Sequence, residues 1–205
     1  MTFESLALYA ALSLGMSVFS GITGGGAGFV LTPLMILLGL SPAQAVSTSK
    51  ISGLTLAVGS LGGLRAERVR IRRMRHWLLL ALAVAVGLAV PALIVSLEST
   101  VYRIAMGVLI LLMIPIMIIR QVGVRETHPG PVQRAVGLPL LALAMLLQGM
   151  FSGGLATLVN IVLMSMFGLT ALEANVLKRW IQIVLNATIV LMAASGLALV
   201  FGLGS

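Results

Sequence analysis

The chain contains 205 residues, of which 60% are hydrophobic, 9% are charged and none is cysteine. Soluble domains have about a quarter charged residues, so a globule of this composition could not cover itself with polar surface. The absence of cysteine also excludes disulfide bonds, thiolate metal sites and cysteine nucleophiles. These properties predict an integral membrane protein, whose surroundings are the lipid bilayer.

The formal net charge of +8 is unevenly distributed along the chain. Most of the cations lie in two short stretches, and they are Arg65, Arg68, Arg70, Arg72, Arg73, Arg75, Arg120, Arg125 and Arg134. Basic loops beside apolar spans mark the cytoplasmic face of a membrane protein, where they meet anionic lipid headgroups. The charge is therefore interpreted as an orientation signal, and no nucleic-acid partner is expected.

Eight apolar segments follow one another, at about 4–21, 28–40, 42–64, 77–97, 101–120, 137–151, 155–168 and 171–201. A helix needs roughly 20 residues to span a bilayer, and segments 42–64, 77–97, 101–120 and 171–201 reach that length. The others are shorter, and two of them, 28–40 and 155–168, each follow a glycine cluster. The N-terminus lacks the basic region of a secretory signal, so its apolar run is expected to be the first helix of the mature protein.

The two basic loops divide the chain into five regions. These are a first repeat (1–64), a cytoplasmic basic loop (65–76), a transmembrane hairpin (77–121), a cytoplasmic linker (122–136) and a second, inverted repeat (137–205). Three segments precede the first basic loop and three follow the second. Both chain termini are therefore expected outside the cell.

An offset of 129 residues aligns the two repeats. It brings Gly24 and Gly25 onto Gly153 and Gly154, and a cation onto a cation, Lys50 onto Arg179. By the topology above, the copies enter the membrane from opposite sides. The predicted fold class is therefore all-α, a polytopic membrane protein with inverted repeats that contain short or broken helices, a plan that secondary transporters use around a central binding site.

The glycine cluster of the first copy is a candidate anion site. Consecutive glycines cost a helix about 1 kcal/mol each, so the chain is expected to break there and expose backbone N–H groups. The N-terminus of the following helix and the Thr23 hydroxyl would add donors for an anion. Tight helix packing through small residues is the alternative explanation.

Lys50 and Arg179 each lie eight residues into their apolar segments, at a depth of about 12 Å. A cation near the bilayer centre costs roughly 2.5–3.5 kcal/mol, and the chain has no Asp and only Glu173 nearby to neutralise it. An unneutralised cation favours a substrate anion, although long side chains also snorkel to the interface. We expect Lys50 and Arg179 to face one cavity, and Lys178 to face lipid headgroups or a partner helix.

Polar side chains accompany both cations. Asn175, Arg179, Gln182 and Asn186 share one helix face, and Ser47, Thr48 and Ser49 precede Lys50. Amides and hydroxyls beside a cation suit an oxyanion with several acceptor oxygens. Hydrogen bonding between helices is the alternative role for Gln182 and Asn186.

Nothing in the membrane segments predicts an enzyme. His76 and His128 lie in the basic loops, and no Ser–His pair, carboxylate pair or metal-ligand set falls at membrane depth. We therefore expect no catalytic residue, no metal and no cofactor. A non-transporting membrane scaffold or an anion channel subunit are the alternatives to a transporter.

The chain resembles the TauE/SafE sulfite-exporter family of bacterial membrane proteins. The resemblance rests on Gly21-Ile-Thr-Gly-Gly-Gly-Ala-Gly-Phe-Val-Leu-Thr-Pro-Leu and on Gly39-Leu-Ser-Pro-Ala-Gln-Ala-Val-Ser-Thr-Ser-Lys50. A weaker second copy reads Gly149-Met-Phe-Ser-Gly-Gly154 and Glu173-Ala-Asn-Val-Leu-Lys-Arg179. The resemblance implies a permease or exporter in the bacterial inner membrane for sulfite, an organosulfonate or another small sulfur-containing anion.

The resemblance and the polar stripe together give the candidate substrate-binding residues. They are Thr23, Gly24, Gly25, Gly26, Ser47, Thr48, Ser49, Lys50, Ser152, Gly153, Gly154, Asn175, Arg179 and Gln182. Typical relatives continue with a further pair of spans after the second copy. Either a homodimer completes the wall of the pathway, or the shorter fold is sufficient by itself.

Overall fold

The computed structural model describes residues 11, 15, 27–64, 75–120, 130–151 and 155–195. Within these ranges the chain forms seven helices and no strand, as the all-α prediction requires. The helices are α2 (Ala27–Leu37), α3 (Pro42–Leu64), α4 (Arg75–Ser96), α5 (Ser99–Arg120), α6 (Pro131–Phe151), α7 (Ala156–Phe167) and α8 (Ala171–Ala194).

Three of the described helices, α4, α6 and α8, are long and apolar enough to cross a membrane. The sequence prediction was wrong about the length of α6. It counted only the apolar segment 137–151, which is too short to span a bilayer. The helix begins six residues earlier, at Pro131, and its polar first turn completes the length. Proline suits the first helical position, and the Gln133 side chain accepts a hydrogen bond from the Gly130 N–H at 3.0 Å to cap the start.

The two short helices end in the same way. Gly39 after α2 and Gly168 after α7 both have positive φ angles, 96° and 65°, which glycine adopts without strain. Two residues later, Ser41 and Thr170 each cap the next helix through a reciprocal pair of bonds, with Gln44 and Glu173 respectively.

These capping residues are related by the 129-residue offset that aligns the glycine clusters. Both copies therefore carry the same device, a short helix, a left-handed glycine and a capping box that starts a long helix.

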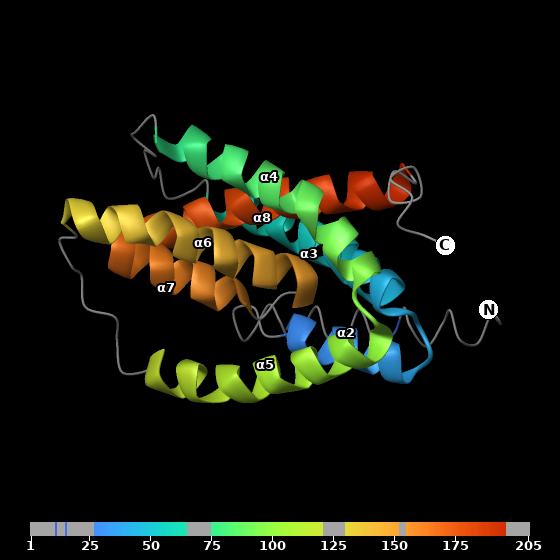
Figure 1. Ribbon diagram of the computed structural model, residues 1–205. Helices are drawn as coiled ribbons and strands as arrows, with labels where there is room; N and C mark the ends of the chain where they lie inside the picture. Colours follow the sequence, from blue (N-terminus) through green and yellow to red (C-terminus); the bar gives the residue numbers. More distant parts are fainter. Residues whose placement is uncertain are drawn as a thin grey trace.

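Figure 1 shows how the helices are arranged. The long helices α3 and α8 pack against each other and run in opposite directions, and α4 covers α8 while α6 packs on α4 and α7. The ends of α3 and α5 and the starts of α4 and α6 lie at one end of the bundle (Figure 1). The start of α3, the α4–α5 turn and the end of α8 lie at the other end.

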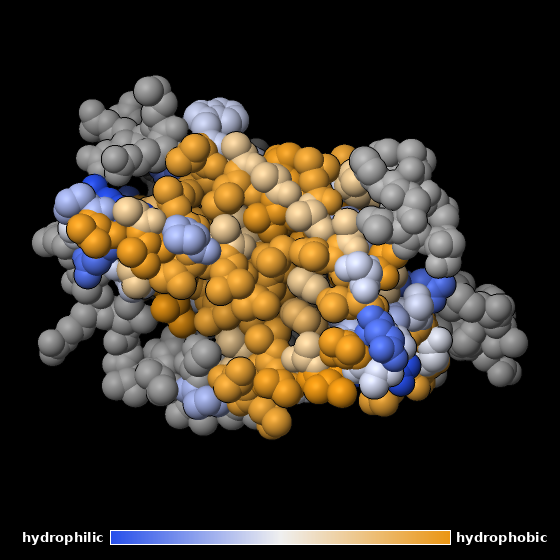
Figure 2. Space-filling view, in the orientation of Figure 1, coloured by the Kyte–Doolittle hydropathy of each residue, from blue (hydrophilic) through white to orange (hydrophobic). Residues whose placement is uncertain are grey.

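The outer surface of the bundle is apolar. Figure 2 shows a hydrophobic band across the middle, with hydrophilic side chains gathered toward the two ends. Large hydrophobic side chains that are exposed on it include Leu88 on α4, Ile104 and Leu111 on α5, and Leu143 on α6. This distribution is that of a protein whose sides face hydrocarbon and whose ends face water.

Small residues allow the central helices to approach closely. A Cβ on Gly87 of α4 would lie 2.9 Å from the Cβ of Thr188 on α8, and a Cβ on Gly149 of α6 would lie 2.5 Å from Val90 Cγ2 on α4. Close backbone approach at glycines is a common means of packing helices in lipid, where the hydrophobic effect does not drive helices together.

Gly149→Ala should destabilise the bundle by about 1–3 kcal/mol, because the stiff Val90 side chain cannot move aside without shifting α4. Thermal unfolding of the purified protein in detergent measures the loss. Gly107→Ala on α5 is the matched control, since nothing lies within 4 Å of the added Cβ. The packing argument is wrong if Gly149→Ala unfolds at the same temperature as Gly107→Ala. It is also wrong if adding Val90→Ala to Gly149→Ala, which removes the clashing methyl groups, does not restore stability.

Candidate anion-binding site

Lys50 lies at the centre of the candidate site. Its side chain is 2% exposed, and its ammonium group donates a hydrogen bond to the main-chain oxygen of Gln148. Gln148 stands in the last turn of α6, where the final four carbonyls have no partner within the helix. A cation is favourable at this negative end of a helix, so α6 supplies part of the stabilisation that Lys50 needs inside the bundle.

A second side chain holds the same helix end. The hydroxyl of Tyr102, on α5, donates to the main-chain oxygen of Met150 at 2.6 Å. Its ring is fully buried and stacks on Phe151 with the centroids 5.1 Å apart. Lys50 and Tyr102 therefore fix the C-terminal turn of α6 from two different helices.

Buried amides lie one turn from Lys50 along α3. Gly53, one turn further along α3, allows α8 to approach, and Asn186 Nδ2 lies 3.0 Å from the place of a Cβ on Gly53. Gln182 Nε2 lies 3.8 Å from the same place. We call Lys50, Gln148, Gln182 and Asn186, all at most 5% exposed, the central polar layer.

The central polar layer is incompletely satisfied. Among the described residues, Gln148 Oε1 and Asn186 Oδ1 are buried side-chain atoms without a hydrogen-bond partner. An unpaired polar atom in apolar surroundings costs several kcal/mol by transfer measurements in hydrocarbon, and about 1–3 kcal/mol in proteins. Both atoms are acceptors, so only a guest that donates a hydrogen bond would satisfy them.

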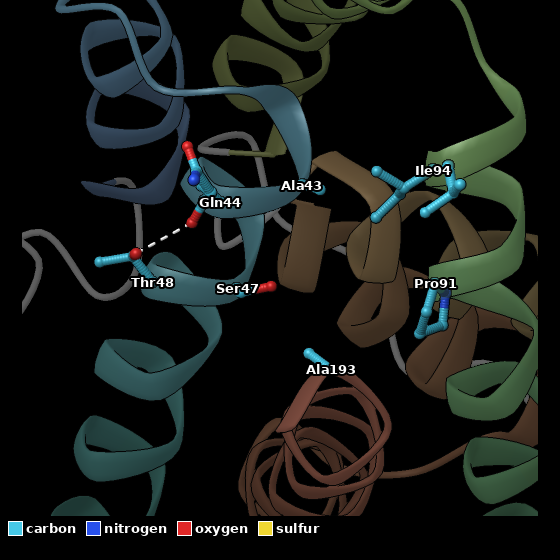
Figure 3. A pocket seen from close by; sticks show the side chains of 8 residues that line it. Ala43, Gln44, Ser47, Thr48, Pro91, Ile94 and Ala193 are labelled. Atoms are coloured by element: carbon cyan, nitrogen blue, oxygen red, sulfur yellow. Dashed lines mark hydrogen bonds between the residues drawn. The ribbon is translucent and has the colours of Figure 1, made fainter. Parts of the chain in front are cut away.

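A cavity of about 410 Å³ opens one helical turn from Lys50, at the end of the bundle where α3 starts and α8 ends. It is lined by Ala43, Gln44, Ser47, Thr48, Pro91, Ile94, Val95 and Ala193. In Figure 3 the Ser47 hydroxyl points into the space, while the Thr48 hydroxyl is turned to the Gln44 main-chain oxygen at 2.9 Å. Ser47, which lines the cavity, is three residues from Lys50 and shares a face of α3 with it.

The sequence model of one family, Sulfite exporter TauE/SafE, matches residues 9–204, nearly the whole chain. The chain belongs to the TauE/SafE family. This confirms the resemblance that the glycine-rich first copy suggested, and it makes the protein a membrane transporter rather than an enzyme. No curated protein and no solved structure matches the chain.

The structure brings only some of the predicted site residues together in this TauE/SafE chain. Lys50 and Gln182 belong to the central polar layer, and half-buried Arg179 donates to Gln182 Oε1 at 3.4 Å. Ser49 is buried and donates to the Val46 main-chain oxygen at 2.8 Å. Seven predicted residues lie outside the described ranges: Thr23, Gly24, Gly25, Gly26, Ser152, Gly153 and Gly154.

Of the two surroundings expected for Lys178, the structure shows a neighbouring helix, not lipid headgroups. It is 5% exposed, and it donates to Asn175 Oδ1 at 3.0 Å on the side of α8 that meets α7. Arg179 is the more exposed of the two cations. The sequence could not decide between them, because both neighbours fit a stripe with Asn175 and Gln182 at helical spacing.

Sequence reasoning missed Gln148, Tyr102 and Asn160. All three are polar side chains inside otherwise apolar helices, which is the one signal that could have identified them. Gln148 and Asn160 are each 1% exposed and Tyr102 is fully buried. Their positions in α6, α5 and α7 place them around the helices that carry the cations.

Tyr102→Phe removes only the hydroxyl that holds the end of α6. We expect a loss of about 0.5–1.5 kcal/mol in the free energy of unfolding, because one buried hydrogen bond disappears while the ring still stacks on Phe151. Chemical or thermal unfolding in detergent checks this value. A variant as stable as the unmodified chain would show that the hydroxyl does not support α6.

Proposed function

We propose that the chain carries a small oxyanion, sulfite or an organosulfonate, across the bacterial inner membrane, and that the anion binds at the central polar layer. The main support is Lys50, a buried cation without a neutralising carboxylate among the described residues. Glu98 is exposed at the α4–α5 turn, and Glu173 is engaged in the capping box of α8. A buried unpaired cation is costly, and a bound anion removes that cost.

The donor set suits an oxyanion. The Lys50 ammonium supplies charge, and the amide groups of Gln182 and Asn186 lie one turn away across the α3–α8 contact. The Ser47 hydroxyl offers a donor at the cavity. Sulfite and sulfonates present three acceptor oxygens, which such a set of donors from different directions can satisfy.

Binding would begin with an exchange of partners at Lys50. Its ammonium group donates a hydrogen bond to the Gln148 main-chain oxygen. An anion that arrives through the cavity offers a charged acceptor, which makes a stronger hydrogen bond than a neutral carbonyl. Substrate would therefore loosen the end of α6, and the glycine clusters at 24–26 and 153–154 are proposed to line the rest of the pathway.

Lys50→Met keeps the length of the side chain and removes its charge. We expect sulfite flux into proteoliposomes, driven by a membrane potential, to fall by about 10- to 150-fold, the value of one charge-assisted hydrogen bond. Tyr102→Phe is the matched control, because it removes a hydrogen bond to the same helix end without altering charge. Equal flux losses in the two variants would mean that Lys50 acts only as a cap for α6.

We also propose that the basic loops are cytoplasmic and the termini external. The cysteine-free chain allows single-cysteine labelling in intact cells. Gly130→Cys, exposed at the start of α6, should react only with membrane-permeant maleimide, and Glu98→Cys, at the opposite end of the bundle, also with impermeant reagent. The reverse pattern would overturn the orientation of both repeats.

A further inference from the structure

A second polar cluster lies between α7 and α8, apart from the central polar layer. Asn160 Nδ2 and Lys178 Nζ both donate to Asn175 Oδ1, at 2.9 Å and 3.0 Å. Asn160 is 1% and Lys178 5% exposed. Lys178 precedes Gln182, the member of the central polar layer nearest to it on α8, by four residues, which corresponds to about 6 Å along the helix. The two clusters are therefore one helical turn apart.

The remaining oxygen of this cluster is unsatisfied. Asn160 Oδ1 is buried and has no hydrogen-bond partner among the described residues. Exchanging Oδ1 and Nδ2 of Asn160 by rotating its side-chain amide does not satisfy the oxygen, because the Asn160 oxygen would then face the Asn175 oxygen. Asn175 cannot turn either, since its oxygen already accepts from Lys178. The network thus fixes an acceptor beside a cation.

An acceptor and a cation side by side define the chemistry of a guest. An anion with only bare oxygens could accept a further hydrogen bond from Lys178 but would meet the lone pairs of Asn160 Oδ1. A guest with both a charged oxygen and an O–H group satisfies both at once. Hydrogen sulfite, the singly protonated form of sulfite, is such a species.

We propose that Asn160, Asn175 and Lys178 form a second anion station, which takes the protonated oxyanion through an O–H bond to Asn160 Oδ1. This proposal rests on the proposed function, because it adds a station on the same pathway. The first repeat has no equivalent, since the 129-residue offset places Leu31 opposite Asn160 and Ser49 opposite Lys178. The station therefore belongs to the half of the bundle where α8 begins.

Methanesulfinate provides the decisive comparison, because it carries two bare oxygens on sulfur and the single charge but a methyl group in place of the O–H. Calorimetric binding of both anions to the purified full chain is measured in mildly acidic buffer, where sulfite is mainly hydrogen sulfite. The unmodified chain should prefer hydrogen sulfite, and Asn160→Leu should lower that preference by about 2- to 13-fold, the value of one hydrogen bond. A ratio of affinities does not depend on the folded fraction of a variant.

Two controls frame the result. Tyr102→Phe should keep the preference of the unmodified chain, and Lys178→Met should weaken both anions together. Asn160→Ala repeats the test if the leucine variant does not insert. Three results would each overturn the station: an unchanged preference in the Asn160 variants, no preference in the unmodified chain, or no binding at all. The last of these is also the result expected if only water binds to Asn160 Oδ1.

Failure of the proposed function has a different signature. Selective binding that Asn160→Leu abolishes, together with no anion flux in proteoliposomes, would support the station while removing the transport proposal. Flux that Lys50→Met abolishes, together with an unchanged preference in Asn160→Leu, would support transport and remove the station.

Discussion

The close contact between α3 and α8 is the constraint on which the rest of the structure depends. At Gly53 there is no side chain to hold the two helices apart, and the amides of Gln182 and Asn186 occupy the space that a Cβ would need. This contact places amide groups one turn from Lys50 and carries all of them away from lipid. A Cβ at Gly53 would lie closer to Asn186 Nδ2 than an ordinary contact, so the side chain of Asn186 would have to shift.

The C-terminal turn of α6 is the second element of this arrangement, because it is held by Lys50, the side chain that is proposed to bind the anion. A helix that ends inside a bundle has carbonyls that need donors, and Lys50 and Tyr102 provide two of them. The cation is thus stabilised without a carboxylate, which would have competed with an anionic substrate. Because Lys50 serves both the helix end and the proposed anion, occupancy of the site and the position of α6 are linked by one side chain.

The sequence predicts the repeated units well and the packing partners poorly. The short segments after the glycine clusters appear as α2 and α7, and the start of α3 at Pro42 is as expected, because helix length and turn residues are local properties. The burial of Lys50 also follows from its depth. The bond from Lys50 to α6, the role of Tyr102 and the burial of Lys178 depend on which helices meet. A single sequence does not contain that information. The length of α6 was missed for a different reason, since its polar first turn does not continue the apolar pattern.

The two copies share their turns but differ in their polar chemistry. The same glycine and capping box start α3 and α8, so the third turn of each long helix reaches an equivalent depth from opposite ends of the bundle. In the first copy that turn buries Lys50 against a helix end, and in the second it buries Lys178 against an amide pair. A helix carbonyl can be exchanged for an anion, whereas the amide pair retains an acceptor that selects for an O–H group. On the proposed pathway an anion would therefore meet two different environments, one at Lys50 and one at Lys178.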